Sequence, residues 1–210
     1  MNDIKNTMNV MFMGLPGSGK DTQAEFLQKI LEERDGKGSV LYIYTGARLR
    51  KTEKSGTYTA GLITEKIMKK GAKAPDFLAI WVWAQSFVSE LKKDNHIILS
   101  SSPRTLHEAK ALDDAFAFYN REYVFPIYLN ISLHEASERL SKVVDRGGSD
   151  DVRIDDVPET INKRLAWFET FVRPAIEYYR TESKNKLIEI DGNPHDPERI
   201  HQEIRRAIGL

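Results

Sequence analysis

The residues best suited to chemistry lie in the stretch "GLPGSGKDTQA", residues 14–24, between an apolar run and a helical pattern. The spacing Gly14-x-x-x-x-Gly19-Lys20 is typical of a phosphate-binding loop, whose backbone N–H groups converge on phosphate oxygens beside the positive end of a helix. Glycine permits this approach because it has no Cβ. Lys20 is then expected to reach the β- and γ-phosphates. A strand-to-helix turn that is merely rich in glycine is the alternative, and the order of strand, loop, lysine and helix favours the phosphate site.

An aspartate, Asp21, follows the lysine where such a loop usually has the serine or threonine that touches magnesium, and Thr22 comes one place later. A carboxylate is a good oxygen ligand for Mg²⁺. An acid in the first turn of a helix also stabilises the helix dipole while pointing away from a nucleotide. Two interpretations of Asp21 therefore stay open, a magnesium ligand and a helix-terminal acid.

Arginines are the second group of candidates, because phosphate groups are negatively charged and are bound by clustered cations. The planar guanidinium can bind two phosphate oxygens at once. Arg104 follows an apolar run and a proline, at the strand end where α/β sheets place ligands. Arg146 and Arg153 lie in the polar stretch 146–157, where solvated surface charges are also expected.

Four segments resemble, in chain order, the motifs of the adenylate kinase family of nucleoside monophosphate kinases. Gly14–Gln23 is similar to the family's G-x-P-G-x-G-K-x-T-Q loop, and Tyr44–Arg50 to its T-G-x-x-L-R segment. Ser102–Ala109 resembles F-P-R-T-x-x-Q-A, and Arg153–Leu165 resembles the R-x-D-D-x-x-E-T-x-x-x-R-L stretch after the lid. The resemblance spans nearly the whole chain and implies transfer of the γ-phosphoryl group of ATP, as its Mg²⁺ complex, to a nucleoside monophosphate.

The resemblance also implies which residues bind each substrate. Those expected to bind the donor ATP are Gly14, Pro16, Gly17, Ser18, Gly19, Lys20, Thr22 and Arg139, with Asp21 added as a hypothetical Mg²⁺ ligand. Those expected to bind the acceptor are Thr45, Gly46, Arg50, Arg104 and Glu108. The cations expected to act in catalysis are Lys20, Arg104, Arg146, Arg153 and Arg164.

The segment Ser100–Arg104 departs from the family, which has D-G-F-P-R there. The family's aspartate, which holds the water shell of magnesium, is replaced by Ser100, and a serine holds magnesium far less strongly than a carboxylate does. We hypothesise that Asp21 compensates, so that the carboxylate has moved from one strand end to another. The alternative is a nucleotide-binding regulatory protein with impaired turnover.

Glu108 is the second departure, because the family has an adenine-reading glutamine at this position. An ionised carboxylate accepts hydrogen bonds but cannot donate one. Adenine offers an acceptor at N1 beside the donor N6, which suits an amide, whereas guanine offers two donors on N1 and N2, which suit a carboxylate. GMP is therefore a candidate acceptor beside AMP, although Thr45 resembles the adenine-type enzymes. Glu108 as a surface residue of a helix over 105–119 is the alternative. The segment TGARLR argues against some other small phosphate or hydroxyl acceptor.

Short β-rich runs alternate with longer helical patterns, which predicts an α/β three-layer P-loop NTPase fold with a five-stranded parallel sheet. The expected strands are 9–13, 40–44, 96–100, 125–131 and 186–190. The expected helices are about 20–34, 60–70, 76–93, 105–119, 133–145, 158–181 and 195–208. One domain is expected, with a core of 1–45, 76–145 and 158–210, a helical monophosphate-binding insert at 46–75 and a short lid at 146–157.

Two helical patterns also carry packing predictions. Residues 76–91 place Phe77, Ile80, Trp81, Ala84, Phe87, Val88 and Leu91 on one stripe, which predicts that this stripe packs in the core. Pro174 lies inside the helical pattern 158–181 and is expected to kink or locally disrupt it.

Composition bounds the remaining possibilities. The chain has 210 residues, and its Lys plus Arg and Asp plus Glu both count 31, so no net charge points to nucleic acid or a membrane surface as partner. The absence of cysteine excludes disulfides and thiolate zinc sites. No apolar stretch is long enough to span a membrane, and the N-terminus lacks a secretory pattern. We expect a soluble, cytoplasmic monomer.

Overall fold

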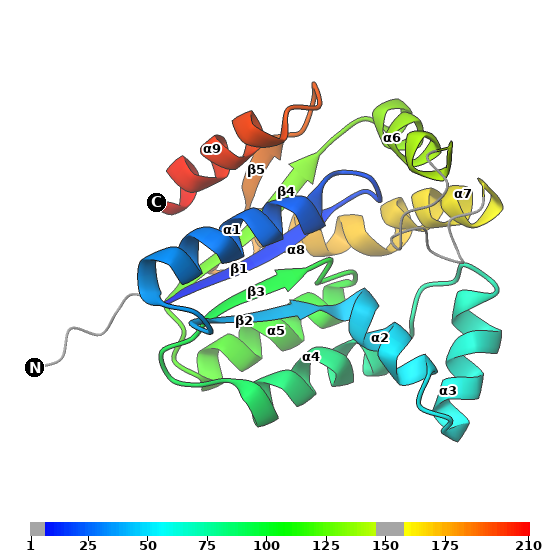
Figure 1. Cartoon of the computed structure of the whole chain (residues 1–210), viewed down its shortest axis with the longest axis horizontal. Helices are drawn as coiled ribbons and strands as arrows, with labels where there is room; N and C mark the ends of the chain where they lie inside the picture. The colour runs from blue at the N-terminus through cyan, green and yellow to red at the C-terminus, as the bar shows by residue number, and fades with distance from the viewer. Residues whose placement is uncertain (1–6, 146–157) are drawn as a thin grey trace, which may run out of the picture.

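A five-stranded parallel sheet forms the centre of the protein in a computed structural model, which describes residues 7–145 and 158–210 (Figure 1). The strands lie in the order β2-β3-β1-β4-β5. Their bounds are β1 Met8–Gly14, β2 Val40–Tyr44, β3 His96–Ser100, β4 Tyr123–Asn130 and β5 Ile188–Asp191. All five expected strands are confirmed, with differences only at their ends.

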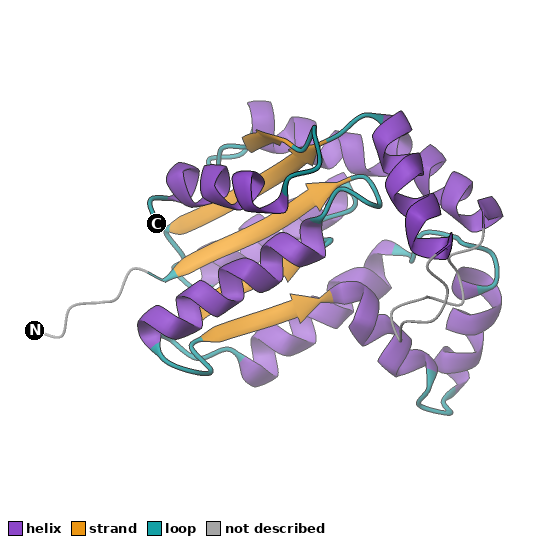
Figure 2. Cartoon of the chain, turned by 45° about the horizontal axis from the view of Figure 1, so that its top comes forward, coloured by secondary structure: helices purple, strands orange, loops and turns teal. Residues whose placement is uncertain are grey.

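Helices cover both faces of this sheet (Figure 2). Those over the sheet are α1 Lys20–Asp35 and α9 Pro197–Ile208 on one face, and α4 Asp76–Glu90, α5 Leu106–Phe118 and α8 Arg173–Thr181 on the other. The remaining helices are α2 Thr45–Glu53, α3 Tyr58–Ile63, α6 Leu133–Asp145, α7 Pro158–Trp167 and the π-helices Thr64–Met68 and Phe168–Val172. Among the described residues, no helix is long and apolar enough to cross a membrane.

Strand β1 shows why the strands read as continuous apolar runs. Successive side chains of a strand point to opposite faces, and both faces of this sheet are buried. Val10 and Phe12 pack under α1 and α9, whereas Met11 and Met13 pack under α4, α5 and α8. Because β1 is buried on both sides, the loop that follows it starts from a rigid support.

Helix α4 corrects part of the predicted packing stripe. Phe87 is buried and Ile80, Ala84 and Leu91 pack against the core, but Phe77, Trp81 and Val88 are 71%, 44% and 81% exposed. The face that packs inward instead carries Leu78, Ala79, Val82, Trp83, Ser86 and Phe87. Both faces of α4 are apolar, so periodicity alone could not choose between them, and the position of the sheet decided the orientation.

The helical pattern 158–181 is interrupted near Pro174, as predicted. The helix α7 passes into a π-helical turn over Phe168–Val172, and α8 begins at Arg173. Proline has no N–H to donate and its ring crowds the preceding turn, so it is best placed in the first turn of a new helix.

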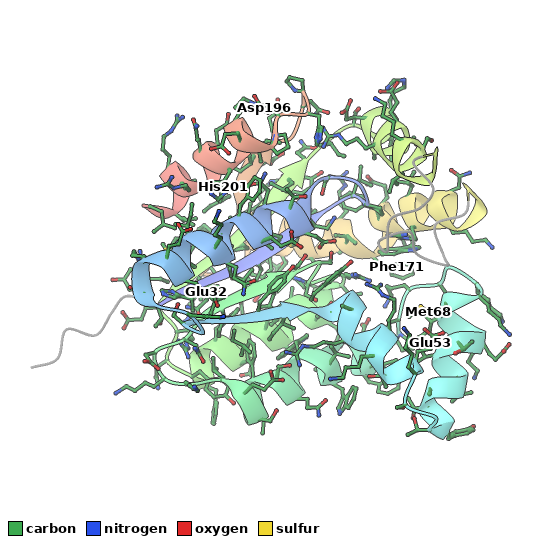
Figure 3. The ribbon with its side chains drawn as sticks, in the orientation of Figure 1. Glu32, Glu53, Met68, Phe171, Asp196 and His201 are labelled. Carbon is green, nitrogen blue, oxygen red and sulfur yellow. The ribbon has the colours of Figure 1, made fainter. Side chains whose placement is uncertain are left out.

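Residues 45–68 form three consecutive helical segments: the helix expected at about 60–70 is formed by α3 and the π-helix that follows it, and α2 is a helix that the sequence analysis did not list. They pack around a small cluster of their own with the start of α4, comprising Leu49, Ile63, Ile67, Ala74, Leu78 and Val82. Glu53, labelled in Figure 3, accepts a hydrogen bond from Thr64 Oγ1 at 2.9 Å and so ties α2 to the π-helix.

Candidate active site

The parallel register brings the candidate residues to one edge of the sheet. Phe12 of β1 and Tyr44 of β2 both pair with Ser100, the last residue of β3. The carboxyl ends of β1, β2 and β3 therefore meet, as ligand-binding edges do in open α/β sheets. They point to the side of the molecule where α2, α3, α6 and α7 lie (Figure 1).

The glycine-rich loop between β1 and α1 requires glycine for two different reasons. At Gly14, φ is +147° and a Cβ would lie 2.7 Å from the carbonyl oxygen of Leu129. At Gly19, φ is +89°, a left-handed conformation that glycine adopts without strain, and there is open space where its Cβ would be. Gly19 precedes α1 without a side-chain cap, so the first amides of α1 are available to an anion.

Lys20 is held at the loop by three acceptors. Its ammonium donates to the carbonyl oxygens of Leu15 at 2.7 Å and Gly14 at 3.1 Å, and to Ser18 Oγ at 3.2 Å. The positive charge therefore lies beside the loop amides. Cation and amides together form a site suited to the phosphates of a nucleotide.

Asp21, the residue after the loop lysine, is in direct contact with Ser100, which stands where the family has an aspartate. The Ser100 hydroxyl donates a hydrogen bond to Asp21 Oδ1. Burial and then the negative charge of Asp21 raise the pKa of nearby Tyr42. The Asp21 carboxylate thus lies at the end of β3 and does not turn away from the sheet.

The oxygen donors at this place fit a magnesium ion that is bound mainly through phosphates and water. No group of three His, Cys, Asp or Glu side chains in the described part of the chain could hold a metal alone. Mg²⁺ bound with a nucleotide needs only one or two protein carboxylates, and it prefers oxygen ligands. Asp21 supplies a carboxylate next to Lys20, and Ser100 adds a hydroxyl.

Arg104 lies at the end of β3 with its guanidinium fixed. Its Nε donates to the Ser101 carbonyl oxygen at 2.8 Å. Burial lowers the pKa of Arg104, the Glu108 carboxylate opposes this shift, and the like charge of Arg164 adds to it. The effect of Arg164 shows that two of the expected cations are near each other.

The candidate acceptor side contains three buried polar side chains, Thr45, Ser102 and Glu108. Thr45 Oγ1 and Ser102 Oγ lie 2.7 Å apart and share a hydrogen bond. Glu108 is only 1% exposed, and its Oε2 accepts from the backbone N–H of Arg104 at 2.7 Å. The interpretation of Glu108 as a surface residue is therefore wrong: one face of α5 packs against the sheet, and Glu108 is on that face.

A small cavity of about 20 Å³ joins these residues. Its lining is Thr45, Gly46, Leu49, Lys73, Ala74, Asp76, Ala79, Arg104, Thr105 and Glu108. Arg50 lies nearby, with its guanidinium carbon 5.4 Å from the ring centre of Tyr44. The structure therefore brings all five expected acceptor residues to one region.

Arg139, from α6, joins the glycine-rich loop to the turn after β5. It donates to the Gly17 carbonyl oxygen at 3.4 Å and to that of Gly192 at 2.6 Å. Glu135 fixes the same guanidinium at 2.7 Å. Arg139 therefore lies on the donor side of the site.

The other expected residues lie in or beside the loop, except two. Pro16 and Gly17 are half-buried in the loop, Ser18 is buried and Thr22 is exposed on α1. Arg146 and Arg153 lie outside the described residues.

Sequence reasoning missed four residues that lie at the candidate acceptor side, namely Tyr44, Lys73, Asp76 and Ser102. Lys73 pairs with Asp76 at 2.7 Å, and its ammonium lies 5.2 Å from the ring centre of Phe171, which Figure 3 labels. The start of α4 at Asp76 could have indicated the pair, because an acid is favoured in a first turn. Nothing in the sequence pattern singled out Lys73.

Comparison with known proteins agrees with this geometry. The model of the family described as adenylate kinase matches residues 12–184. An adenylate kinase of Dehalococcoides mccartyi is 34% identical over 88% of this chain and 90% of its own length. The adenylate kinase of Azobacteroides pseudotrichonymphae is 34% identical over 96% of this chain and 97% of its own length. The adenylate kinase of Thermosipho melanesiensis is 31% identical over 96% of this chain and 99% of its own length. The chain therefore belongs to the adenylate kinase family and is a phosphotransferase, a nucleoside monophosphate kinase.

Proposed function

We propose that this protein transfers the γ-phosphoryl group of ATP, bound with Mg²⁺, to AMP. The observation that carries the proposal is the meeting of two phosphate-binding sets at one sheet edge. One set is the glycine-rich loop with Lys20, and the other is Arg104 beside Thr45. A protein that only binds ATP has no use for the second set.

The roles follow from the charges. Lys20 and the loop amides bind the donor phosphates, and Arg139 supports the loop from α6. Arg50 and Arg104 bind the acceptor phosphate. Arg164, with Arg146 and Arg153, neutralises the group in transfer. The attacking phosphate oxygen is already anionic, so no side chain needs to remove a proton.

Asp21 is proposed to hold the magnesium ion. When bound, Mg²⁺ neutralises charge on the β- and γ-phosphate oxygens. The hydrogen bond from Ser100 supports this role, because it fixes the carboxylate at the end of β3. A simple helix-terminal acid would not need that contact.

Residues 46–75 and 146–157 are proposed to act as the acceptor-binding insert and the lid, with the remaining residues as core. Closing both segments over the substrates would exclude water, which otherwise accepts the phosphoryl group. A movement of these segments would also explain the size of the cavity beside Glu108. In this structure the cavity has room for little more than a water molecule, so a nucleotide would need it to open.

GMP is a second candidate acceptor, favoured by one observation. Glu108 has a carboxyl where an amide would suit adenine, and its Oε2 already accepts from Arg104. An ionised carboxylate suits the two neighbouring donors of guanine.

The test is an assay of ADP formation with Mg-ATP and AMP, GMP, CMP or UMP in turn, beside a control without acceptor. Acceptor-dependent turnover with AMP supports the proposal, and a preference for GMP replaces AMP by the second candidate. If no acceptor gives turnover while ATP still raises the melting temperature, the protein is a regulatory nucleotide-binding protein. The replacement of the family's aspartate by Ser100 favours this outcome.

A further inference from the structure

The Glu108 carboxyl has one satisfied and one unsatisfied oxygen in a buried position. The backbone N–H of Arg104 donates to Oε2 at 2.7 Å. Oε1 is buried, and no described residue gives it a hydrogen bond. Buried polar atoms nearly always have a partner, so an unpaired one in a binding site indicates a ligand atom.

The cavity beside Glu108 shows where that ligand would come from. Thr45 and Gly46 of α2 form one wall, and Arg104 and Glu108 form another. A cavity of about 20 Å³ holds a water-sized molecule but no nucleobase. A base therefore reaches Glu108 only when the walls of this cavity move apart.

Several charged groups surround the carboxyl and set its protonation. Burial raises the pKa of Glu108, and the backbone N–H and the positive charge of Arg104 lower it. The nearby Ser102 hydroxyl also lowers it, whereas the negative charge of Asp76 on α4 raises it. Lys73 pairs with Asp76 at the cavity wall, and Tyr179 of α8 donates to the Ala109 carbonyl oxygen next to Glu108. The net direction is upward, toward the neutral acid.

We propose that Glu108 selects the acceptor base through its own protonation: the neutral acid binds adenine, and the carboxylate binds guanine. As an acid, Oε1 donates its O–H to adenine N1, and Oε2 accepts from N6 while keeping the N–H of Arg104. As a carboxylate, it accepts from guanine N1 and N2. This inference rests on the proposed function, because it concerns the acceptor of that reaction.

The direction of the pH dependence follows from the two forms. Below the pKa of Glu108 in the folded protein the acid predominates, so AMP is favoured. Above that pKa the carboxylate predominates, so GMP is favoured. AMP and GMP carry the same phosphate and react at the same donor site. The titration of these groups therefore cancels in the ratio of the two kcat/KM values.

The experiment compares kcat/KM for AMP and GMP between about pH 5.5 and 8.5, a range that spans the values found for buried carboxyls. We expect the AMP-to-GMP ratio to fall about ten- to a hundredfold as pH rises, which is the cost of one unpaired buried hydrogen-bonding group. Glu108→Gln should favour AMP with a ratio that is flat with pH, because an amide donates and accepts throughout. His107→Gln is the matched control, since His107 is the exposed neighbour on α5 and its loss should leave the slope unchanged.

Calorimetry of AMP and GMP binding in two buffers of different ionisation enthalpy gives a readout without turnover. Above the pKa, AMP binding should take up one more proton than GMP binding, and Glu108→Gln should abolish the difference. A pH-independent ratio in the unmodified protein, or a slope that persists in Glu108→Gln, would overturn the inference. If turnover is absent but the proton uptake is seen, the proposed reaction fails while the role of Glu108 stands. If neither nucleotide binds, both fail.

Discussion

Asp21 and Ser100 form a hydrogen-bonded pair in which Ser100 stands where the family pattern has an aspartate. The serine is at the end of β3, and the aspartate follows Lys20 at the start of α1. The hydrogen bond between them puts the Asp21 carboxylate next to the position from which a carboxylate at the end of β3 would extend. The sheet edge therefore still has an acidic group, but this group comes from the start of α1 and not from the end of β3.

Replacing Asp21 by glycine is expected to lower Mg-ATP turnover by about a hundredfold, because one charge-stabilising group is lost from the reacting phosphates. Adding Ser100→Asp to that variant should restore most of it. ATP affinity measured with Mg²⁺ and with a chelator reports the ion directly, and Asp21→Gly should lose the difference between the two. Glu25→Gln, an exposed acid one turn further along α1, is the control for charge alone. Full turnover in Asp21→Gly with Ser100 intact would contradict the magnesium role.

Gly14→Ala is expected to destabilise the protein by about 1–3 kcal/mol or more and to weaken ATP binding, because the new Cβ would lie 2.7 Å from a backbone oxygen. Gly61→Ala is the matched control. Gly61 lies in α3 with nothing within 4 Å of the added Cβ, so alanine should stabilise that helix by about 0.5–1 kcal/mol. Denaturant unfolding measures both changes, and equal effects would contradict the close packing at Gly14.

At the scale of an element, α4 presents apolar side chains on two faces. One face packs on the core through Trp83 and Phe87, and the other exposes Phe77, Trp81 and Val88. The exposed fraction determines how much Phe87 and Phe77 each contribute to the free energy of unfolding, because a side chain stabilises the fold only when it is taken out of water.

Phe87→Ala should therefore cost about 3–5 kcal/mol of unfolding free energy, the range for a large side chain removed from a packed core. Phe77→Ala, its counterpart on the same helix, should change it by no more than about 0.5 kcal/mol. Chemical denaturation of the two variants measures the contrast. Comparable losses would mean that the exposed face of α4 is covered in solution.

The helices also show which parts of the fold could be predicted from the sequence. The strands and the loop around Lys20 were predictable because short continuous apolar runs and a fixed glycine spacing are local signals. The orientation of α4 and the burial of Glu108 were not, because both depend on which face of a helix meets the sheet. The sequence suggested that Asp21 takes over the function of the aspartate that is missing at Ser100, but it did not indicate a contact between the two residues. The register of β1 with β3 brings them together.

At the scale of the whole molecule, ligand binding should stabilise the fold. ATP at about a hundred times its Kd adds about 2.7 kcal/mol, which raises Tm by about 5–10 °C for a chain of this size. A thermal melt with Mg-ATP measures this. Lys20→Met should lose most of the shift, and Lys29→Met, exposed further along the same helix, should keep it. An unchanged shift in Lys20→Met would contradict the assignment of the donor site.

The strand order has a consequence for how the protein is made. Strand β1 leads into the phosphate loop, but its neighbours β3 and β4 are separated from it in the chain by several helices. While the ribosome is still synthesising α4 or α5, β1 lacks one or both of its partners. The central strand that supports the nucleotide site is thus among the last to be completed, and nascent chains that end before β4 should not bind ATP.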